Sequence, residues 1–125
     1  EIKAIVLSAM LRLKNSSKEE VSAKINEFSE RRKSAQPPGA SMGSMFKNPP
    51  NYYAGYLIDT AGLKGFQVGN VRISDKHANF FVSDGDATAE DIRSLIAEAW
   101  NTVREQFGVE MDLEVEMVGN WHFEK

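Results

Sequence analysis

The chain has 125 residues, of which 42% are hydrophobic and 26% are charged, as expected for one globular domain with its own core. Its net charge of −3 argues against a protein that binds nucleic acid through a broad basic surface. The absence of cysteine excludes a disulfide framework and a thiolate metal site. The longest apolar run, AIVLSAML, is much shorter than the roughly 20 residues of a membrane-spanning helix, and no signal-peptide pattern is present.

Residues 2–13, IKAIVLSAMLRL, are rich in Ile, Val, Leu and Met and predict a mostly buried strand. The chain begins at Glu1 rather than at a methionine and enters this apolar segment almost at once. Two interpretations follow. In the first, the chain is a domain that begins with a strand, as many domains do. In the second, the chain is a piece of a longer protein.

A helix is predicted at residues 18–35. Ser17 and Glu20 have the spacing of a capping box, and a Pro-Pro pair prevents the helix from continuing beyond residue 36. Apolar residues recur in it at helical spacing: Val21, Ile25 and Phe28.

A basic triplet, Arg31–Lys33, lies near the end of this predicted helix. Cations there interact favourably with the helix dipole. The triplet would also suit contact with an anionic ligand, and the residues alone leave both interpretations open.

The middle of the chain is predicted to form a long loop at residues 37–52 and a short helix at residues 53–61, which ends at Gly62. Two strands are then predicted, at residues 67–74 and 78–83.

A second long helix is predicted from the Thr88 and Asp91 capping pattern to Gly108. Its apolar face is formed by Ile92, Leu95, Ile96, Ala99, Trp100, Val103 and Phe107. Alternating apolar and acidic residues at 111–117 predict a last strand. The element order is therefore β-α-α-β-β-α-β, which predicts a two-layer α+β domain with a small mixed or antiparallel sheet covered by helices.

Residues 43–49, GSMFKNP, raise a chemical question. Gly, Ser, Asn and Pro are common turn formers, so an ordinary turn explains the segment. The alternative is that the glycine lets a ligand approach Ser44 closely and that the serine hydroxyl takes part in chemistry.

Other catalytic patterns have little support. His77 and His122 are the only histidines, and neither belongs to an HExxH motif, so no metal site is predicted. The glycines form no GxGxxG motif, and nothing specifies a Ser-His-Asp triad. A scattered polar set remains, and each member has an ordinary structural explanation: Ser44, Asn48, Lys64, Lys76, His77 and Glu114.

Four segments together resemble one protein family. In chain order they read QPPGASMGSMFKNPPNYYAGYLIDTAGLKG, GNVRISDKHANFFVS, TAEDI and FGVEMDLEVEMVG. Over about residues 2–119 the chain resembles the C-terminal part of UDP-N-acetylenolpyruvoylglucosamine reductase, also called UDP-N-acetylmuramate dehydrogenase. The resemblance implies a bacterial cytoplasmic flavoenzyme of peptidoglycan precursor synthesis. Such an enzyme passes hydride from NADPH through FAD to the enolpyruvyl ether of a UDP-sugar.

The resemblance also implies a division of labour within a longer protein. Residues 1–14 would be the last strand of a preceding flavin-binding region, and residues 15–125 would be the C-terminal substrate-binding domain. FAD and NADPH would be bound mainly by the upstream domains. We therefore expect the chain alone to hold no cofactor and to be inactive as a reductase.

The resemblance implies a set of site residues. Ser44 corresponds to the proton donor to the substrate carbon next to the carboxylate, and Glu114 corresponds to the glutamate that stabilises the enol-like intermediate. Further substrate contacts are implied at Asn48, Lys64, His77, Gln36 and Lys33. The last two lie near the diphosphate-binding stretch.

The implied partners are the UDP-sugar substrate and the upstream domains, with no nucleic acid or membrane. The alternative is a stand-alone α+β interaction module without catalysis. Retention of both Ser44 and Glu114 favours the enzyme domain.

Overall fold

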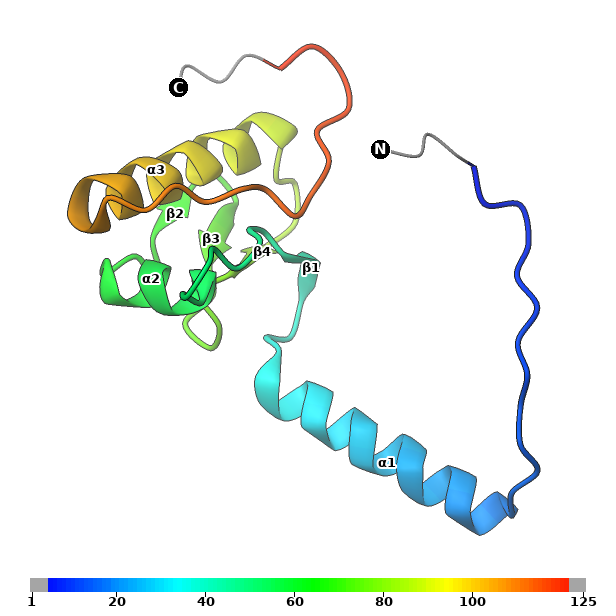
Figure 1. Ribbon diagram of the computed structural model, residues 1–125. Helices are drawn as coiled ribbons and strands as arrows, with labels where there is room; N and C mark the ends of the chain where they lie inside the picture. Colours follow the sequence, from blue (N-terminus) through cyan, green and yellow to red (C-terminus); the bar gives the residue numbers. More distant parts are fainter. Residues whose placement is uncertain (1–4, 122–125) are drawn as a thin grey trace. The chain divides into compact units, whose positions relative to one another are not determined.

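The computed structural model describes residues 5–121, which contain three helices and a four-stranded antiparallel sheet (Figure 1). The predicted α+β class is therefore confirmed. The chain divides into two compact units, with the boundary between Arg31 and Arg32. Residues 1–4 and 122–125, including the start of the predicted first strand and His122, lie outside the described part.

The predicted first strand is wrong over residues 5–13. These residues have no regular secondary structure, and their side chains are exposed, with Met10 99% accessible to solvent. A strand requires a hydrogen-bonded neighbour, and no described residue pairs with this segment. The assignment of residues 1–14 to a preceding region stays a prediction.

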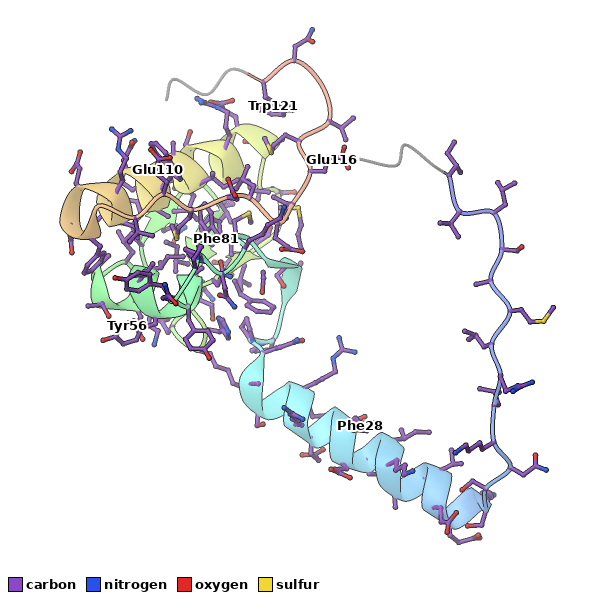
Figure 2. All side chains as sticks on the ribbon, in the orientation of Figure 1. Phe28, Tyr56, Phe81, Glu110, Glu116 and Trp121 are labelled. Carbon is purple, nitrogen blue, oxygen red and sulfur yellow. The ribbon has the colours of Figure 1, made fainter. Side chains whose placement is uncertain are left out.

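The first helix, α1, spans Lys18–Ala35 and matches the predicted bounds. Its capping box is present, because the backbone N–H of Glu20 donates to Ser17 Oγ at 3.2 Å and the Ser17 N–H donates to Glu20 Oε2 at 3.4 Å. Hydrogen bonds from Ser16 and Ser17 hold the pKa of the Glu20 carboxyl below its usual value. The predicted apolar stripe is exposed, and Figure 2 labels one of its members, Phe28.

The sheet has the strand order β1-β4-β3-β2, and every neighbouring pair is antiparallel. Its strands are β1 (Ala40–Ser44), β2 (Gln67–Val68), β3 (Val71–Ile73) and β4 (Phe80–Ser83).

The predicted loop at 37–52 is wrong where it includes β1. The strand sequence ASMGS has the composition of a turn and no alternation of apolar residues, so propensity did not indicate a strand. Pairing with β4 at the edge of the sheet overrides that local preference.

The predicted strand at 67–74 is two strands, because a tight turn at Gly69 and Asn70 separates β2 from β3. This turn lies against the start of α3, which spans Ala89–Phe107. Hydrogen bonds from Thr88, with a smaller contribution from the Asn70 backbone, lower the pKa of the Asp91 carboxyl. Asp91 therefore closes the predicted capping box and also contacts the turn.

The contact between Asp91 and the turn leaves room only for glycine at position 69. Its φ of 54° is left-handed, and a Cβ atom at this position would lie 2.4 Å from Asp91 Oδ1. We expect Gly69→Ala to lower the free energy of unfolding by about 2–3 kcal/mol, because it combines left-handed strain with loss of the cap. Urea denaturation measures the change. Gly108→Ala is the matched control, because its φ of 67° is similar but its Cβ would meet no atom within 4 Å. An equal decrease in the free energy of unfolding of the two variants would contradict the role of Asp91.

The core lies between the sheet and α3, with α2 (Ala54–Thr60) packed beside α3. Both helices match the predictions, and α3 ends at Gly108 as expected. Four of the seven predicted face residues are buried: Leu95, Ile96, Ala99 and Val103. Figure 2 shows Phe81 of β4 among the dense side chains of this core.

The predicted last strand is not formed. Within residues 111–117 only Leu113 makes a bridge, to Phe46. The alternation is nevertheless real, because Met111 is buried and every second residue after it is more buried than its neighbours. None of the helices between residues 5 and 121 has the length and apolar character needed to cross a membrane.

Candidate functional site

A polar cavity of about 420 Å³ lies within the second unit, between α2, the end of β1 and the connection from β3 to β4. It brings together four of the seven residues implied as site residues: Ser44, Asn48, Lys64 and His77. Its other lining residues are Tyr53, Gly55, Tyr56, Asp59, Lys76, Ala78 and Asn79. The cavity thus gathers hydroxyl, amide, ammonium and imidazole groups from distant parts of the sequence.

Ser44 is the last residue of β1 and is half-buried at the cavity. The register of β1 against β4 shifts between Ser41 and Ser44, a β-bulge. Gly43 lies within this irregularity with a φ of 84°, and a Cβ atom at this position would meet no atom within 4 Å. Backbone conformation therefore explains the glycine, and the open space beside it is compatible with close approach of a ligand.

Asn48 has a structural role at the start of α2, which differs from the turn-forming role that its place before a proline suggested. Its Oδ1 accepts a hydrogen bond from the backbone N–H of Ala54 at 3.0 Å, and Ala54 is the first residue of α2. The side chain thereby satisfies an amide that the helix itself leaves without a partner. Contact between Asn48 and substrate stays a prediction.

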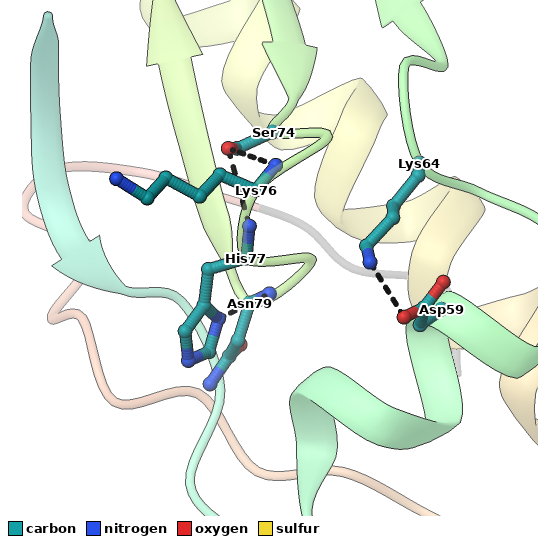
Figure 3. A network of polar contacts seen from close by, with 6 residues as sticks. All are labelled: Asp59, Lys64, Ser74, Lys76, His77 and Asn79. Atoms are coloured by element: carbon teal, nitrogen blue, oxygen red, sulfur yellow. Dashed lines mark hydrogen bonds and ion pairs between the residues drawn. The ribbon is translucent and has the colours of Figure 1, made fainter. Parts of the chain in front are cut away.

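His77 is held by a compact polar turn (Figure 3). Ser74 Oγ accepts hydrogen bonds from the backbone N–H groups of Lys76, at 3.1 Å, and His77, at 3.3 Å. His77 Nδ1 accepts the backbone N–H of Asn79 at 3.3 Å. In the neutral imidazole the proton therefore lies on Nε2, and the ring offers an N–H donor to a ligand in the cavity it lines.

The glycine of α2 allows the helix to pack against this imidazole. A Cβ atom on Gly55 would lie 3.0 Å from His77 Cε1 and 3.4 Å from Nδ1. A larger residue at this position would displace the histidine ring, so Gly55 helps to set the shape of the cavity.

Lys64 reaches the cavity in an ion pair with Asp59, with 2.6 Å between Nζ and Oδ2 (Figure 3). Both side chains are about a third to a half exposed, so the pair contributes little to stability. The ion pair instead fixes the position of the Lys64 ammonium group at the cavity.

Glu114 is not among the residues that line the cavity, and its side chain is exposed. Its backbone is nevertheless close to the site, because its N–H donates to the carbonyl oxygen of Met45 at 2.9 Å. Met45 follows Ser44 directly. The structure therefore brings the backbone of Glu114 beside the serine segment, and it does not place the carboxylate in the cavity.

Lys33 and Gln36 line a second depression of about 350 Å³, with Arg32, Pro37, Pro38 and Lys76. Lys76 lines both depressions, and its Nζ donates to the backbone carbonyl oxygen of Lys33 at 2.5 Å. This second depression is basic and adjoins the cavity at Lys76.

Sequence reasoning missed several cavity residues: Tyr53, Tyr56, Asp59 and Asn79. The first three are each three residues apart in the predicted helix at 53–61. Residues with this spacing share one face of a helix, so the sequence could have identified them as a group. No sequence signal identified Asn79, whose side-chain contacts are long-range.

Comparisons with known proteins agree on one family. The family model described as UDP-N-acetylenolpyruvoylglucosamine reductase, C-terminal domain, matches residues 34–118. A protein named UDP-N-acetylenolpyruvoylglucosamine reductase from Caldicellulosiruptor bescii is 46% identical over 124 residues, which are 97% of this chain and 40% of the relative. A protein of the same name from Chloroflexus aggregans is 46% identical over 91% of this chain and 38% of its own length.

A solved structure gives the same result. The crystal structure of UDP-N-acetylenolpyruvylglucosamine reductase from Thermus caldophilus matches with a TM-score of 0.68 and 42% sequence identity. The match covers 84% of this chain and 37% of that one. The chain thus spans about 40% of the length of the curated relatives it matches.

Proposed function

Because the chain belongs to the family of the UDP-N-acetylenolpyruvoylglucosamine reductase C-terminal domain, we propose that it is the substrate domain of a longer oxidoreductase. The proposed reaction reduces UDP-N-acetylglucosamine enolpyruvate to UDP-N-acetylmuramate, in peptidoglycan precursor synthesis in the bacterial cytoplasm. The observation that carries the proposal is the cavity that gathers Ser44, Asn48, Lys64 and His77.

In the proposed reaction FAD, reduced by NADPH, would supply the hydride. The residues of this cavity do not fit a dinucleotide, since no glycine-rich turn leads from a strand into a helix there. We therefore propose that upstream domains of the same protein hold FAD and NADPH. The described residues of this chain would act on the substrate alone.

Ser44 is proposed as the proton donor. Hydride addition to the enolpyruvyl double bond leaves negative charge on the carbon next to the carboxylate, and a positioned hydroxyl quenches that charge with a proton. Ser44 suits this role because it lines the cavity and is half-buried.

Glu114 is proposed to stabilise the enol-like intermediate. Because the Glu114 side chain is exposed and does not line the cavity, this role requires the reacting part of the substrate to extend from Ser44 toward residues 112–114. Residues 112–114 lie beside the serine segment, since their backbone pairs with that of residues 45–47.

The remaining groups are proposed to bind the anionic parts of the substrate. Lys64 and the Nε2–H of His77 offer charge and a hydrogen-bond donor inside the cavity. Lys33 and Gln36 are proposed to contact the diphosphate in the second depression. A ligand that spans both depressions would pass Lys76, which lines each of them.

We predict that the purified 125-residue chain is colourless and does not oxidise NADPH. The physical reason is that the proposed flavin-binding residues belong to other domains. An absorbance spectrum and an NADPH assay check this expectation. A yellow preparation with flavin at one equivalent per chain would contradict it.

The proposed function is tested by titrating the chain with UDP-N-acetylglucosamine and recording amide chemical shifts by NMR. We expect weak binding, with shifts in residues 36–49 and 64–77, two ranges that contain lining residues of the two depressions. Lys64→Met should weaken binding because it removes a cation from the cavity, whereas Lys24→Met, on the exposed surface of α1, should not. Shifts confined to residues 89–107 would contradict the site. No shifts at all would favour the interaction module.

A further inference from the structure

Asn79 is a buried polar residue whose side chain binds the backbone of one other residue in two ways. Only 4% of Asn79 is exposed. Its Oδ1 accepts the backbone N–H of Phe46 at 2.9 Å, and its Nδ2 donates to the Phe46 carbonyl oxygen at 2.8 Å. The Asn79 carbonyl oxygen also accepts the backbone N–H of Met45 at 2.8 Å.

These three hydrogen bonds extend the pairing of β1 with β4 beyond the end of the strand. β1 ends at Ser44, which is opposite Phe80. Asn79 precedes Phe80 and continues the ladder to Met45 and Phe46, with its side-chain amide taking the place of a further peptide group. The two residues that follow Ser44 are therefore fixed from the β4 side.

The same residues are also fixed from their other side. The Met45 carbonyl oxygen accepts the N–H of Glu114 at 2.9 Å, and the Lys47 N–H donates to the Asp112 carbonyl oxygen at 2.8 Å. Segment 45–47 is thus held between Asn79 and residues 112–114. Because Asn79 also donates its N–H to His77 Nδ1, it is bonded directly to His77 and to Met45, the residue after Ser44. Through Met45 it is also linked to the backbone of Glu114.

We propose that Asn79 is the positioning residue that sets Ser44 relative to Glu114 and His77 in the reducing enzyme. This inference rests on the proposed function. Loss of the side-chain amide would free the peptide group of Phe46 and let the chain after Ser44 move, which would misplace the hydroxyl. Misplacement by about 1 Å is enough to slow a positioned reaction on the order of 10²-fold.

The test uses the intact reductase that carries this domain, with variants Asn79→Ala and Asn79→Asp and the control Asn101→Ala, which changes an exposed residue of α3. Stopped-flow absorbance measures flavin reduction by NADPH and then reoxidation by saturating UDP-N-acetylglucosamine enolpyruvate. We expect reduction within twofold of wild type in all variants. Reoxidation should fall about tenfold to a hundredfold in Asn79→Ala. Its solvent deuterium isotope effect should rise, because proton transfer becomes limiting.

Asn79→Asp should also slow reoxidation, because the carboxylate still accepts the Phe46 N–H but has no proton to donate to the Phe46 carbonyl oxygen. It also serves as the deciding variant where Asn79→Ala does not fold. A second readout is amide hydrogen exchange in the 125-residue chain. The Phe46 amide should lose protection in Asn79→Ala and keep it in Asn101→Ala.

Wild-type reoxidation rates in both Asn79 variants would overturn the positioning role and leave the proposed function intact. Equal slowing of reduction and reoxidation would also overturn it, because that result indicates general disruption. A wild-type enzyme that the enolpyruvyl substrate does not reoxidise would overturn the proposed function, and the role of Asn79 with it.

Discussion

Replacing Ser44 by alanine should slow reoxidation of the intact reductase by its enolpyruvyl substrate by roughly 10²–10⁴-fold. Reduction by NADPH should stay nearly unchanged, because it requires no proton donor to the substrate. Alanine leaves the cavity without the hydroxyl at the end of β1. The loss is expected to reach the upper part of this range where bound substrate excludes water that would otherwise supply the proton.

The matched control is Ser41→Ala, which removes a hydroxyl from an exposed position of the same strand outside the polar cavity. It should leave both half-reactions near wild type. Ser44→Cys should restore part of the rate, because a thiol also donates a proton. Stopped-flow absorbance separates the half-reactions, and wild-type reoxidation in Ser44→Ala would show that the proton comes from another group.

Replacing Phe46 by alanine should lower the free energy of unfolding of the chain by about 3–5 kcal/mol. Phe46 is 1% exposed, and its ring packs edge-to-face against Phe81 with 6.3 Å between centroids. Alanine leaves a cavity between the segment that carries Ser44 and the sheet. The expected loss is a large part of the roughly 5–15 kcal/mol that stabilises a typical domain.

The control for Phe46 is Phe66→Ala, since Phe66 is 40% exposed and an exposed truncation costs about 1 kcal/mol or less. Urea denaturation followed by far-UV circular dichroism measures both variants. Phe46→Leu keeps much of the buried volume, so its decrease in the free energy of unfolding should lie between those of Phe46→Ala and Phe66→Ala. A Phe46→Ala loss no larger than that of Phe66→Ala would contradict the description of Phe46 as a central core residue.

Local sequence signals predicted the helices well. The Ser17 and Thr88 caps and the stop at Gly108 are short-range features that depend on backbone amides within a few residues. The bounds of α1, α2 and α3 follow from such signals. The exposed stripe of α1 shows their limit, because helical spacing predicts which residues share a face and not what that face contacts.

The strands were predicted less well, because their pairing is long-range. β1 has a turn-like sequence and exists because β4 lies beside it. Residues 111–117 have the alternation of a strand but make a single bridge, to Phe46. Residues 5–13 have strand composition and no partner in the described part of the chain.

The candidate site shows the same division. The family resemblance pointed to Ser44, Asn48, Lys64 and His77, and the fold brings these four to one cavity. It did not point to Asn79, because the value of that side chain lies in two hydrogen bonds to a residue 33 positions away. Such contacts depend on the tertiary arrangement and leave no local pattern.

The central claim is that the enolpyruvyl group of the substrate binds at Ser44. The most direct measurement is a crystal structure of the intact reductase with UDP-N-acetylglucosamine enolpyruvate bound. We expect Ser44 Oγ at about 3–3.5 Å from the substrate carbon next to the carboxylate, as a near-attack arrangement requires. The diphosphate is expected beside Lys33 and Gln36. An enolpyruvyl group bound away from Ser44, with another proton donor in contact with that carbon, would contradict the account.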